Sequence, residues 1–376
     1  MNTKKGPAHE REMVDRKCRR NNICSIAAAA SQLYLYVQER QEGMVRIKMK
    51  ISRSIIICVS IILSMAAFAV CTTAAEVRTI NNDEKKSEAR HTGTMRGLYV
   101  PNKKSRDIKY IQALLDTGTP EGINMLVMDV HSYGSVIPRI NTKVIEYCKN
   151  KNVYCVARVV CFQDGLDRMP VPAHRLKRLN ILVEKSAKAG FHEVQLDYIR
   201  FKDGGYPYSL VMKYRFIEEL LAGFKKITDS AGIKLSADVF GRIVYNRNDY
   251  VGQKLEVFAK YTDVIYPMLY PSHFTGDRVR MANPGETVKE GTMKGLDRLR
   301  DTGVKVVPYI QAFDYHIRRA GVSLPRYVEL QVRGVESTKA RGWVAWNAYG
   351  DYRAVMKALR DINGKSEKSV NTARIQ

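Results

Sequence analysis

The sequence lacks the residue patterns of several common function classes. Its seven cysteines are too irregularly spaced for a disulfide framework or a zinc site. No His-x-His pair or acidic cluster supports metal catalysis, and no Gly-x-Ser-x-Gly motif supports a Ser-His-Asp hydrolase. We therefore predict neither a metal nor a cofactor. Cys155 and Cys161 lie within and at the end of a β-branched run, so we expect them to be small buried hydrophobic residues.

Charge of one sign is in excess. The formal net charge is +24, and lysine and arginine clustered on one face would favour a nucleic-acid partner. Here the positive residues are dispersed: residues 1–75 hold 12 Lys and Arg against 5 Asp and Glu, and the rest lie along predicted surface helices. No recognised nucleic-acid-binding motif accompanies them. We expect no nucleic-acid partner, while attraction to anionic polymers stays open.

A long apolar run occurs only near the N-terminus. Residues 55–70 are almost entirely apolar, follow four basic residues and precede the small residues 71–75, which is the order of a signal peptide. The run of 16 residues is short for a membrane-spanning helix of about 20. We expect cleavage near Ala74 or Ala75, with an uncleaved membrane anchor as the alternative. Both place the remaining chain outside the cytoplasm, in the periplasm, the medium or on the outer face of the cytoplasmic membrane.

The chain divides into a leader and one large domain. We expect residues 1–43 to be an unstructured extension or the product of a start codon assigned too early, with translation from Met44. Residues 44–75 then form the signal peptide or anchor, and the polar residues 76–94 form a linker. Residues 95–363 form the domain, and residues 364–376 form a polar tail.

Within the domain, short β-branched runs alternate with longer amphipathic segments, which is typical of βα units. The clearest helix is predicted for residues 214–229, where apolar residues repeat at helical spacing before Gly232. Eight strands can be counted, and they are predicted at residues 97–100, 124–130, 153–160, 193–199, 234–240, 263–269, 304–313 and 343–348. Eight βα units predict an α/β fold of the (β/α)8 TIM-barrel type. A doubly wound open sheet is the alternative, but its glycine-rich turn after the first strand is absent.

Alternation along each strand separates inward from outward side chains. The apolar residues of the fourth and fifth strands suit the helix side, which leaves Gln195 and Asp197, and then Ser236 and Asp238, facing inward. Two carboxylates therefore end adjacent strands at the same end of the barrel, where active sites of this fold lie. The same alternation places five further residues at this end: Tyr99, Asp129, Arg158, Gln311 and Trp346.

Two prolines in the sixth strand, Pro267 and Pro271, prevent such an assignment there, although Tyr270 and His273 follow its end. His273 is interpreted as a sugar-hydroxyl ligand or as a loop-capping histidine. The only two tryptophans, Trp343 and Trp346, are three residues apart and must point to opposite faces. Trp346 is expected either to stack on a sugar ring or to serve as core packing.

Two inward carboxylates beside aromatic rings suit the cleavage of a glycosidic bond. One attacks or stabilises the anomeric carbon, and the other, held protonated, donates to the leaving oxygen. Arg158 or Arg200 could instead be structural ion-pair partners of Asp197. The predicted catalytic residues are Asp197 and Asp238. The predicted substrate-binding residues are Tyr99, Asp129, Arg158, Gln195, Arg200, Tyr270, His273, Gln311 and Trp346.

Five stretches carry a resemblance to a known family: residues 96–100, 194–201, 236–241, 266–273 and 342–347. The sequence resembles a family of bacterial glycoside hydrolases, long catalogued as a domain of unknown function, whose barrel is related to the α-amylase-like glycosidase superfamily. The resemblance covers about residues 95–360, and its most specific block is Asp197-Tyr198-Ile199-Arg200-Phe201. It implies a sugar-cleaving barrel with Asp197 as the nucleophile-like residue and Asp238 as the acid/base-like one. Lys202 departs from the family, which usually has proline there, so the shape of that loop is open.

We therefore predict an exported glycoside hydrolase that cleaves a polysaccharide or oligosaccharide by a two-carboxylate, retaining mechanism. The alternative from another class is a polysaccharide-binding or cell-envelope protein on a barrel that has lost catalysis. In a third interpretation, the basic surface is the functional part of the protein and attracts anionic polymers.

Overall fold

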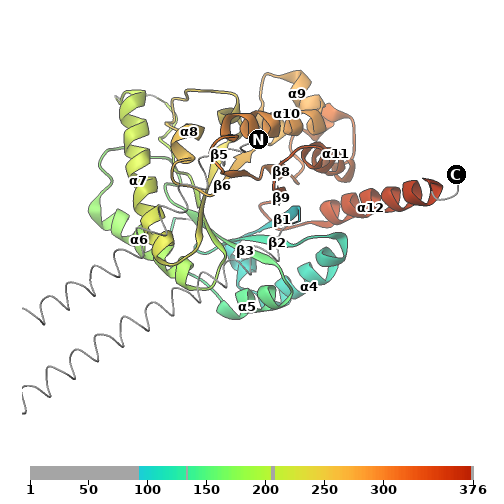
Figure 1. Cartoon of the computed structure of the whole chain (residues 1–376), viewed down its shortest axis with the longest axis horizontal. Coiled ribbons are helices and arrows are strands. Elements are labelled where there is room, and N and C mark those ends of the chain that lie inside the picture. Colours follow the sequence, from blue (N-terminus) through green and yellow to red (C-terminus); the bar gives the residue numbers. More distant parts are fainter. Residues whose placement is uncertain (1–92, 133, 205–207, 374–376) are drawn as a thin grey trace, which may run out of the picture. The chain divides into compact units, whose positions relative to one another are not determined.

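The computed structural model describes residues 93–132, 134–204 and 208–373 (Figure 1). The predicted extension, signal peptide or anchor, and most of the linker lie outside these residues. Among the described residues, no helix combines the length and hydropathy needed to cross a membrane.

The strands form one parallel sheet that closes on itself. Strand β1 pairs with both β2 and β9, and β5 pairs with both β4 and β6. This closure excludes the open doubly wound sheet and confirms the predicted TIM barrel. The strands are β1 (Met95–Val100), β2 (Met125–Asp129), β3 (Tyr154–Val160), β4 (Glu193–Asp197), β5 (Lys234–Phe240), β6 (Val264–Met268), β7 (Lys305–Val306), β8 (Tyr309–Gln311) and β9 (Gly342–Trp346).

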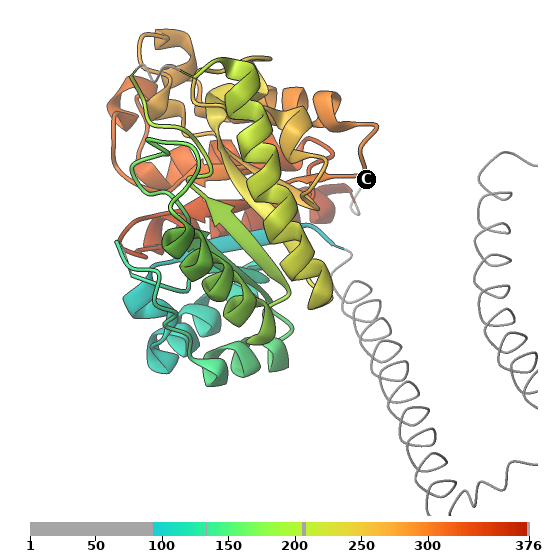
Figure 2. The same cartoon turned by 90° about the vertical axis from the view of Figure 1, so that its left-hand side faces the viewer.

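Helices follow the strands along the chain and surround the barrel (Figures 1 and 2). The α-helices are α3 (Asn102–Ser105), α4 (Ile108–Gly118), α5 (Thr142–Asn150), α6 (Ala173–Lys188), α7 (Leu210–Ser230), α8 (Leu255–Phe258), α9 (Arg278–Ala282), α10 (Pro284–Leu299), α11 (Leu324–Glu336) and α12 (Arg353–Ala373). Single 3-10 turns are η1 (Thr119–Glu121), η2 (Gly241–Val244), η3 (Pro271–His273) and η4 (Ile317–Ala320). Helix α7 contains the segment predicted from its apolar spacing and begins four residues earlier, where the Ser209 side chain accepts a hydrogen bond from the Met212 N–H.

The seventh strand of the barrel is not continuous, which corrects the single strand predicted for residues 304–313. It is divided into β7 and β8, which both pair with β6. Pro308 lies between the two pieces and has no N–H to donate to the ladder. Its carbonyl still accepts a hydrogen bond from the Val344 N–H at 3.0 Å, so the barrel stays closed across the break.

Alternating side chains divide the core into two clusters, as predicted. The apolar residues of the fourth and fifth strands pack outward with the helices. Trp343 and the three described cysteines are buried among them, and these cysteines form no disulfide bond. The second cluster fills the barrel interior and contains Tyr99, Tyr266 and Tyr309. Trp346 packs partly buried against this inner cluster, so the two tryptophans lie on opposite faces of β9.

Strand β4 lines the barrel interior with a column of polar side chains. At the start of the strand, the buried Glu193 carboxylate accepts hydrogen bonds from the hydroxyls of Tyr266 at 2.8 Å and Tyr154 at 3.1 Å. Burial raises the pKa of Glu193. One layer higher, Gln195 Oε1 accepts a hydrogen bond from the Tyr309 hydroxyl at 2.8 Å. Asp197 completes the column at the end where the strands finish, which we call the mouth of the barrel.

Candidate active site

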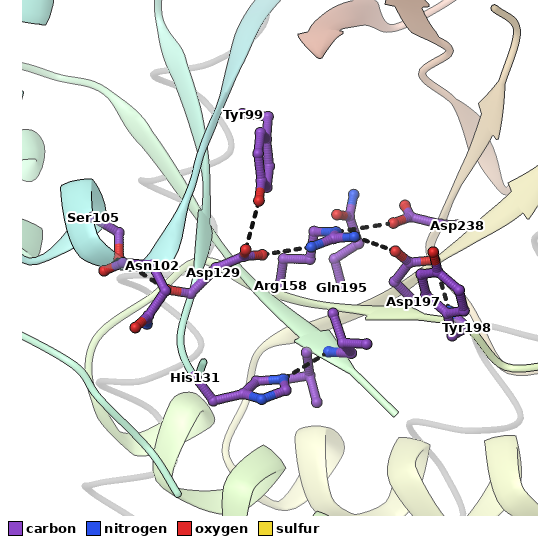
Figure 3. A network of polar contacts seen from close by, with 12 residues as sticks. Tyr99, Asn102, Ser105, Asp129, His131, Arg158, Gln195, Asp197, Tyr198 and Asp238 are labelled. Atoms are coloured by element: carbon purple, nitrogen blue, oxygen red, sulfur yellow. Dashed lines mark hydrogen bonds and ion pairs between the residues drawn. The ribbon is translucent and has the colours of Figure 1, made fainter. Parts of the chain in front are cut away.

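Arg158 lies at the centre of the mouth, between three carboxylates (Figure 3). Its Nη1 atom contacts Asp129 Oδ1 at 2.5 Å, its Nη2 atom contacts Asp197 Oδ2, and its Nε atom is 3.5 Å from Asp238 Oδ2. The four residues end or nearly end the consecutive strands β2 to β5. One cation therefore serves three anions, and the cluster carries excess negative charge unless a carboxyl group holds a proton.

Asp197 is held in place by two donors. Its Oδ2 atom accepts from Arg158, and its Oδ1 atom accepts from the backbone N–H of Tyr198 at 2.6 Å. Tyr198 has a φ of 57°, in the left-handed region that a residue with a Cβ rarely adopts. This strained turn points the amide back at the carboxylate. A cation and a backbone amide thus donate to the two oxygens of Asp197 and fix its orientation.

Asp238 has a different environment. It is 1% exposed, and its Oδ1 atom finds no hydrogen-bond donor among the described residues. Burial raises the pKa of Asp238 well above its ordinary value, the charges of Asp197 and Asp129 raise it further, and Arg158 opposes them. Two neighbouring carboxyl groups thus lie in different environments: Asp197 accepts from two donors, whereas Asp238 is buried and has a raised pKa. Acid–nucleophile pairs rely on such a contrast.

Asp129 is fixed from several sides. Its Oδ2 atom accepts a hydrogen bond from the Tyr99 hydroxyl at 2.6 Å. Its backbone carbonyl accepts from Asn102 Nδ2 at 3.1 Å and from the Ser105 hydroxyl at 2.8 Å, so the start of helix α3 is tied to the end of β2. The carboxylate therefore orients Arg158 from the side opposite Asp197.

The other half of the mouth is aromatic. The rings of Tyr99 and Trp346 are stacked, with centroids 5.1 Å apart and an interplanar angle of 9°. Tyr270 lies 6.3 Å from Trp346 and 5.1 Å from His273, whose pKa is lowered by burial. Phe313 lies 6.0 Å from Trp346. These rings come from the ends of β1, β6, β8 and β9, so they face the charged residues of β2 to β5 across the barrel.

Three residues predicted to bind substrate are buried and use at least one polar atom in contacts within the protein. Gln195 is fully buried one layer below Asp197 and binds Tyr309. Gln311 is also fully buried, and its amide donates to the carbonyls of Phe313 and Tyr315, so it shapes the loop after β8. Arg200 donates to the Phe201 carbonyl at 3.0 Å and is 9% exposed. These contacts hold the three side chains in place around the mouth, and their role in substrate binding stays a prediction.

His131 belongs to the same network and was not predicted. Its Nε2 atom accepts a hydrogen bond from the Val160 N–H at 2.8 Å, which leaves Nδ1 to donate to the Ser135 carbonyl. Burial lowers its pKa, and the neutral ring joins the ends of β2 and β3. Its place two residues after Asp129 was the available signal, but alternation along a strand says nothing about residues beyond the strand end.

Lys202, which stands where the family usually has proline, uses its backbone N–H in a hydrogen bond. Its backbone N–H donates to the Leu166 carbonyl at 2.9 Å, and the Leu166 N–H donates to the Arg200 carbonyl at 2.8 Å. Proline could not make the first of these bonds. Lysine at this position therefore adds a backbone link between the loops that follow β3 and β4, beside Asp197.

A cavity of about 1790 Å³ lies at the opposite end of the barrel, and its lining includes Lys149, Lys305 and Lys339 near the starts of the strands. It does not contain the carboxylates of the mouth. In the part of the chain that the structure describes, no three His, Cys, Asp or Glu side chains are placed to hold a metal ion.

The arrangement at the mouth suits a pyranose ring and its glycosidic bond. Aromatic rings can cover the apolar face of a sugar, and a pair of carboxyl groups opposite them can supply a nucleophile and an acid. Because Asp197 and Asp238 contact the same guanidinium, they lie close enough to act on one bond.

Comparisons with known proteins show which family and which folds this chain is similar to. Residues 169–352 match the family described as “Putative glycosyl hydrolase domain”, a stretch that contains Asp197, Asp238 and Trp346. No curated protein matches the sequence. The glycoside hydrolase domain of PgaB (BpsB) from Bordetella bronchiseptica is similar, with a TM-score of 0.51 and 13% identity over 72% of this chain and 98% of that one. The endo-beta-1,4-mannanase from Thermotoga petrophila has a TM-score of 0.52 and 11% identity over 72% of this chain and 76% of that one. At these identities the two structures support the fold alone.

Proposed function

We propose that the protein cleaves O-glycosidic bonds of a polysaccharide by a two-carboxylate, retaining mechanism, since residues 169–352 match the family described as “Putative glycosyl hydrolase domain”. The observation that carries the proposal is the contrast between Asp197, whose two oxygens accept from Arg158 and Tyr198, and the buried Asp238, whose pKa is raised. Asp197 is the nucleophile, and Asp238 is the acid that protonates the leaving oxygen.

The charges around the pair also support the second step. The Asp197 charge is one of the causes that raise the pKa of Asp238. When Asp197 forms an ester with the sugar, that charge disappears and the pKa of Asp238 falls. Asp238 then holds its negative charge 3.5 Å from Arg158 Nε and can accept a proton from the attacking water.

Retention of the anomeric configuration is supported by the shared guanidinium. Retaining enzymes place their carboxyl groups roughly 5 to 5.5 Å apart, whereas inverting enzymes need a wider gap for water. Two carboxylates that both contact Arg158 favour the shorter separation. Proton NMR of the first product formed tests this, since a product with the opposite anomeric configuration would identify an inverting enzyme.

The activity itself is tested by reducing-sugar release from a panel of bacterial-envelope and plant polysaccharides. The full chain is compared with its Asp197→Asn variant, with circular dichroism to check that both are folded. We expect release from at least one polysaccharide and its loss in the variant. Binding of a glycan by both proteins, with no release by either, would instead identify a polysaccharide-binding protein.

We also propose that the domain acts outside the cytoplasm. The support is the apolar run at residues 55–70, with basic residues before it and small residues after it. Fractionation of cells that express the full chain, followed by N-terminal sequencing, tests this. An N-terminus at about residue 75 in an exported fraction supports cleavage, and a full-length cytoplasmic protein contradicts export.

A further inference from the structure

The aromatic half of the mouth continues outward as a chain of ring contacts. From Trp346 the contacts pass to Phe313 at 6.0 Å, from Phe313 to His273 at 6.1 Å, and from His273 to Tyr315 at 6.2 Å. The inner end of the chain is the Tyr99 ring that Trp346 stacks on. The chain therefore links the carboxylate cluster to a ring at the rim, since Tyr315 is 48% exposed.

The outer rings are held by a buried anchor. Fully buried Gln311 donates its amide hydrogens to the Phe313 carbonyl at 3.0 Å and to the Tyr315 carbonyl at 2.9 Å. The Tyr315 N–H also donates to the Phe313 carbonyl at 3.1 Å. An exposed aromatic ring on a fixed backbone can bind a ligand at a lower entropic cost than one on a free loop.

Two buried hydroxyls beside this chain have no hydrogen-bond partner among the described residues. The Tyr270 hydroxyl is one, although Tyr270 is only 5% exposed, and the Ser272 hydroxyl is the other. Both belong to the segment that carries His273, and the Tyr270 ring contacts His273, Phe313 and Trp346. A buried polar group without a partner costs free energy, and a ligand hydroxyl that reached it would remove that cost.

We propose that Tyr315, His273 and Phe313 form a further sugar-binding subsite, which takes a pyranose ring of the substrate chain beyond the ring at Trp346. Tyr315 covers the apolar face of that sugar, and His273 supplies a ring nitrogen for a hydroxyl. The subsite extends the glycoside hydrolase proposed above, and its part in cleavage rests on that proposed function. It makes the preferred substrate an oligosaccharide several sugars long, which the enzyme cleaves at an internal bond.

The test measures binding in an Asp197→Asn background, so that no substrate is consumed. Cello-, manno- and chito-oligosaccharides are titrated as disaccharides and as hexasaccharides by isothermal calorimetry. Tyr315→Ala is the test variant. Tyr349→Ala is the control, because Tyr349 is another exposed tyrosine at the mouth, 83% exposed, whose side chain has no ring contact with the cluster among the described residues.

We expect Tyr315→Ala to weaken binding of a hexasaccharide by about tenfold and to leave disaccharide binding unchanged, while Tyr349→Ala changes neither. Equal effects of the two substitutions, or an equal loss for both lengths of sugar, would overturn the subsite. So would the absence of binding by any sugar in the set. Turnover of the unsubstituted protein distinguishes failure of the subsite from failure of the proposed function. Length-dependent binding without cleavage supports the subsite and refutes the hydrolase. Cleavage with no effect of Tyr315→Ala refutes only the subsite.

Discussion

Replacing Asp238 by asparagine tests the division of labour between the two carboxyl groups. Asparagine has nearly the same shape as a protonated aspartate, and the raised pKa of Asp238 favours that form in the folded protein. A buried acid whose folded-state pKa is raised stabilises the fold only at low pH, and that stability is lost as the pH rises through the folded-state value. The variant should therefore be at least as stable as the unsubstituted protein at neutral pH.

Activity should depend on the leaving group. A glycoside whose leaving oxygen needs a proton should lose about 10²- to 10⁴-fold in kcat/KM, the usual contribution of a general acid. That corresponds to about 3 to 5 kcal/mol of transition-state stabilisation. A dinitrophenyl glycoside needs no proton to leave, so its first step should be nearly unaffected. Because Asp238 also serves as the base of the second step, a burst of dinitrophenol should precede slow turnover.

The assay compares kcat/KM for the two substrates in both proteins, with Asp197→Asn as the matched control. Removing the nucleophile should reduce cleavage of both substrates alike. Equal losses on both substrates in Asp238→Asn would refute its role as the acid. Leaving-group selectivity in Asp197→Asn instead would exchange the two assignments.

Three further predictions concern stability. Arg158→Gln should lower the free energy of unfolding in urea by about 3 to 5 kcal/mol, because it leaves buried carboxylates without their cation; a change below about 1 kcal/mol would contradict the ion-pair argument. Glu193→Gln should raise the melting temperature at neutral pH and lose this advantage in acid, since burial raises the pKa of Glu193 and ionising it costs stability; a benefit that grew in acid would reverse the sign. Gly241→Ala should destabilise by about 1 to 3 kcal/mol because its Cβ would lie 2.4 Å from the Met268 carbonyl oxygen. Gly223→Ala, in α7 with no atom near the added carbon, should instead stabilise by about 0.5 to 1 kcal/mol, so equal effects at the two glycines would contradict the steric argument.

The barrel and the positions of the charged residues followed from alternation in the sequence. Parallel strands bring their ends to one face, and a period of two decides which side chains point inward. That was enough to place Asp129, Arg158, Asp197 and Asp238 at one mouth. It could not give the distances between them or the protonation of Asp238, which depend on burial and on neighbouring charges.

Residues outside the strands were harder to assign. His131 and Tyr315 act from loops, where no periodicity constrains direction. Gln311 satisfied the inward pattern, but its amide turns to the backbone of the next loop, a choice that depends on contacts distant in sequence. Pro308 marked the break in the seventh strand, yet a proline inside a strand can also be tolerated, as Pro267 is in β6.

The two halves of the mouth also separate along the chain. The four charged residues lie on consecutive strands, β2 to β5, and the rings lie on β9 or just after β6 and β8, with Tyr99 of β1 as the exception. The proposed reactive groups and the proposed recognition groups thus occupy successive parts of the barrel sequence. Substitutions in the later part should therefore change which glycan is held without moving the carboxylates. A chimera that takes residues 264–352 from a related barrel should therefore acquire the sugar preference of its donor while it keeps the bond-breaking groups of this protein.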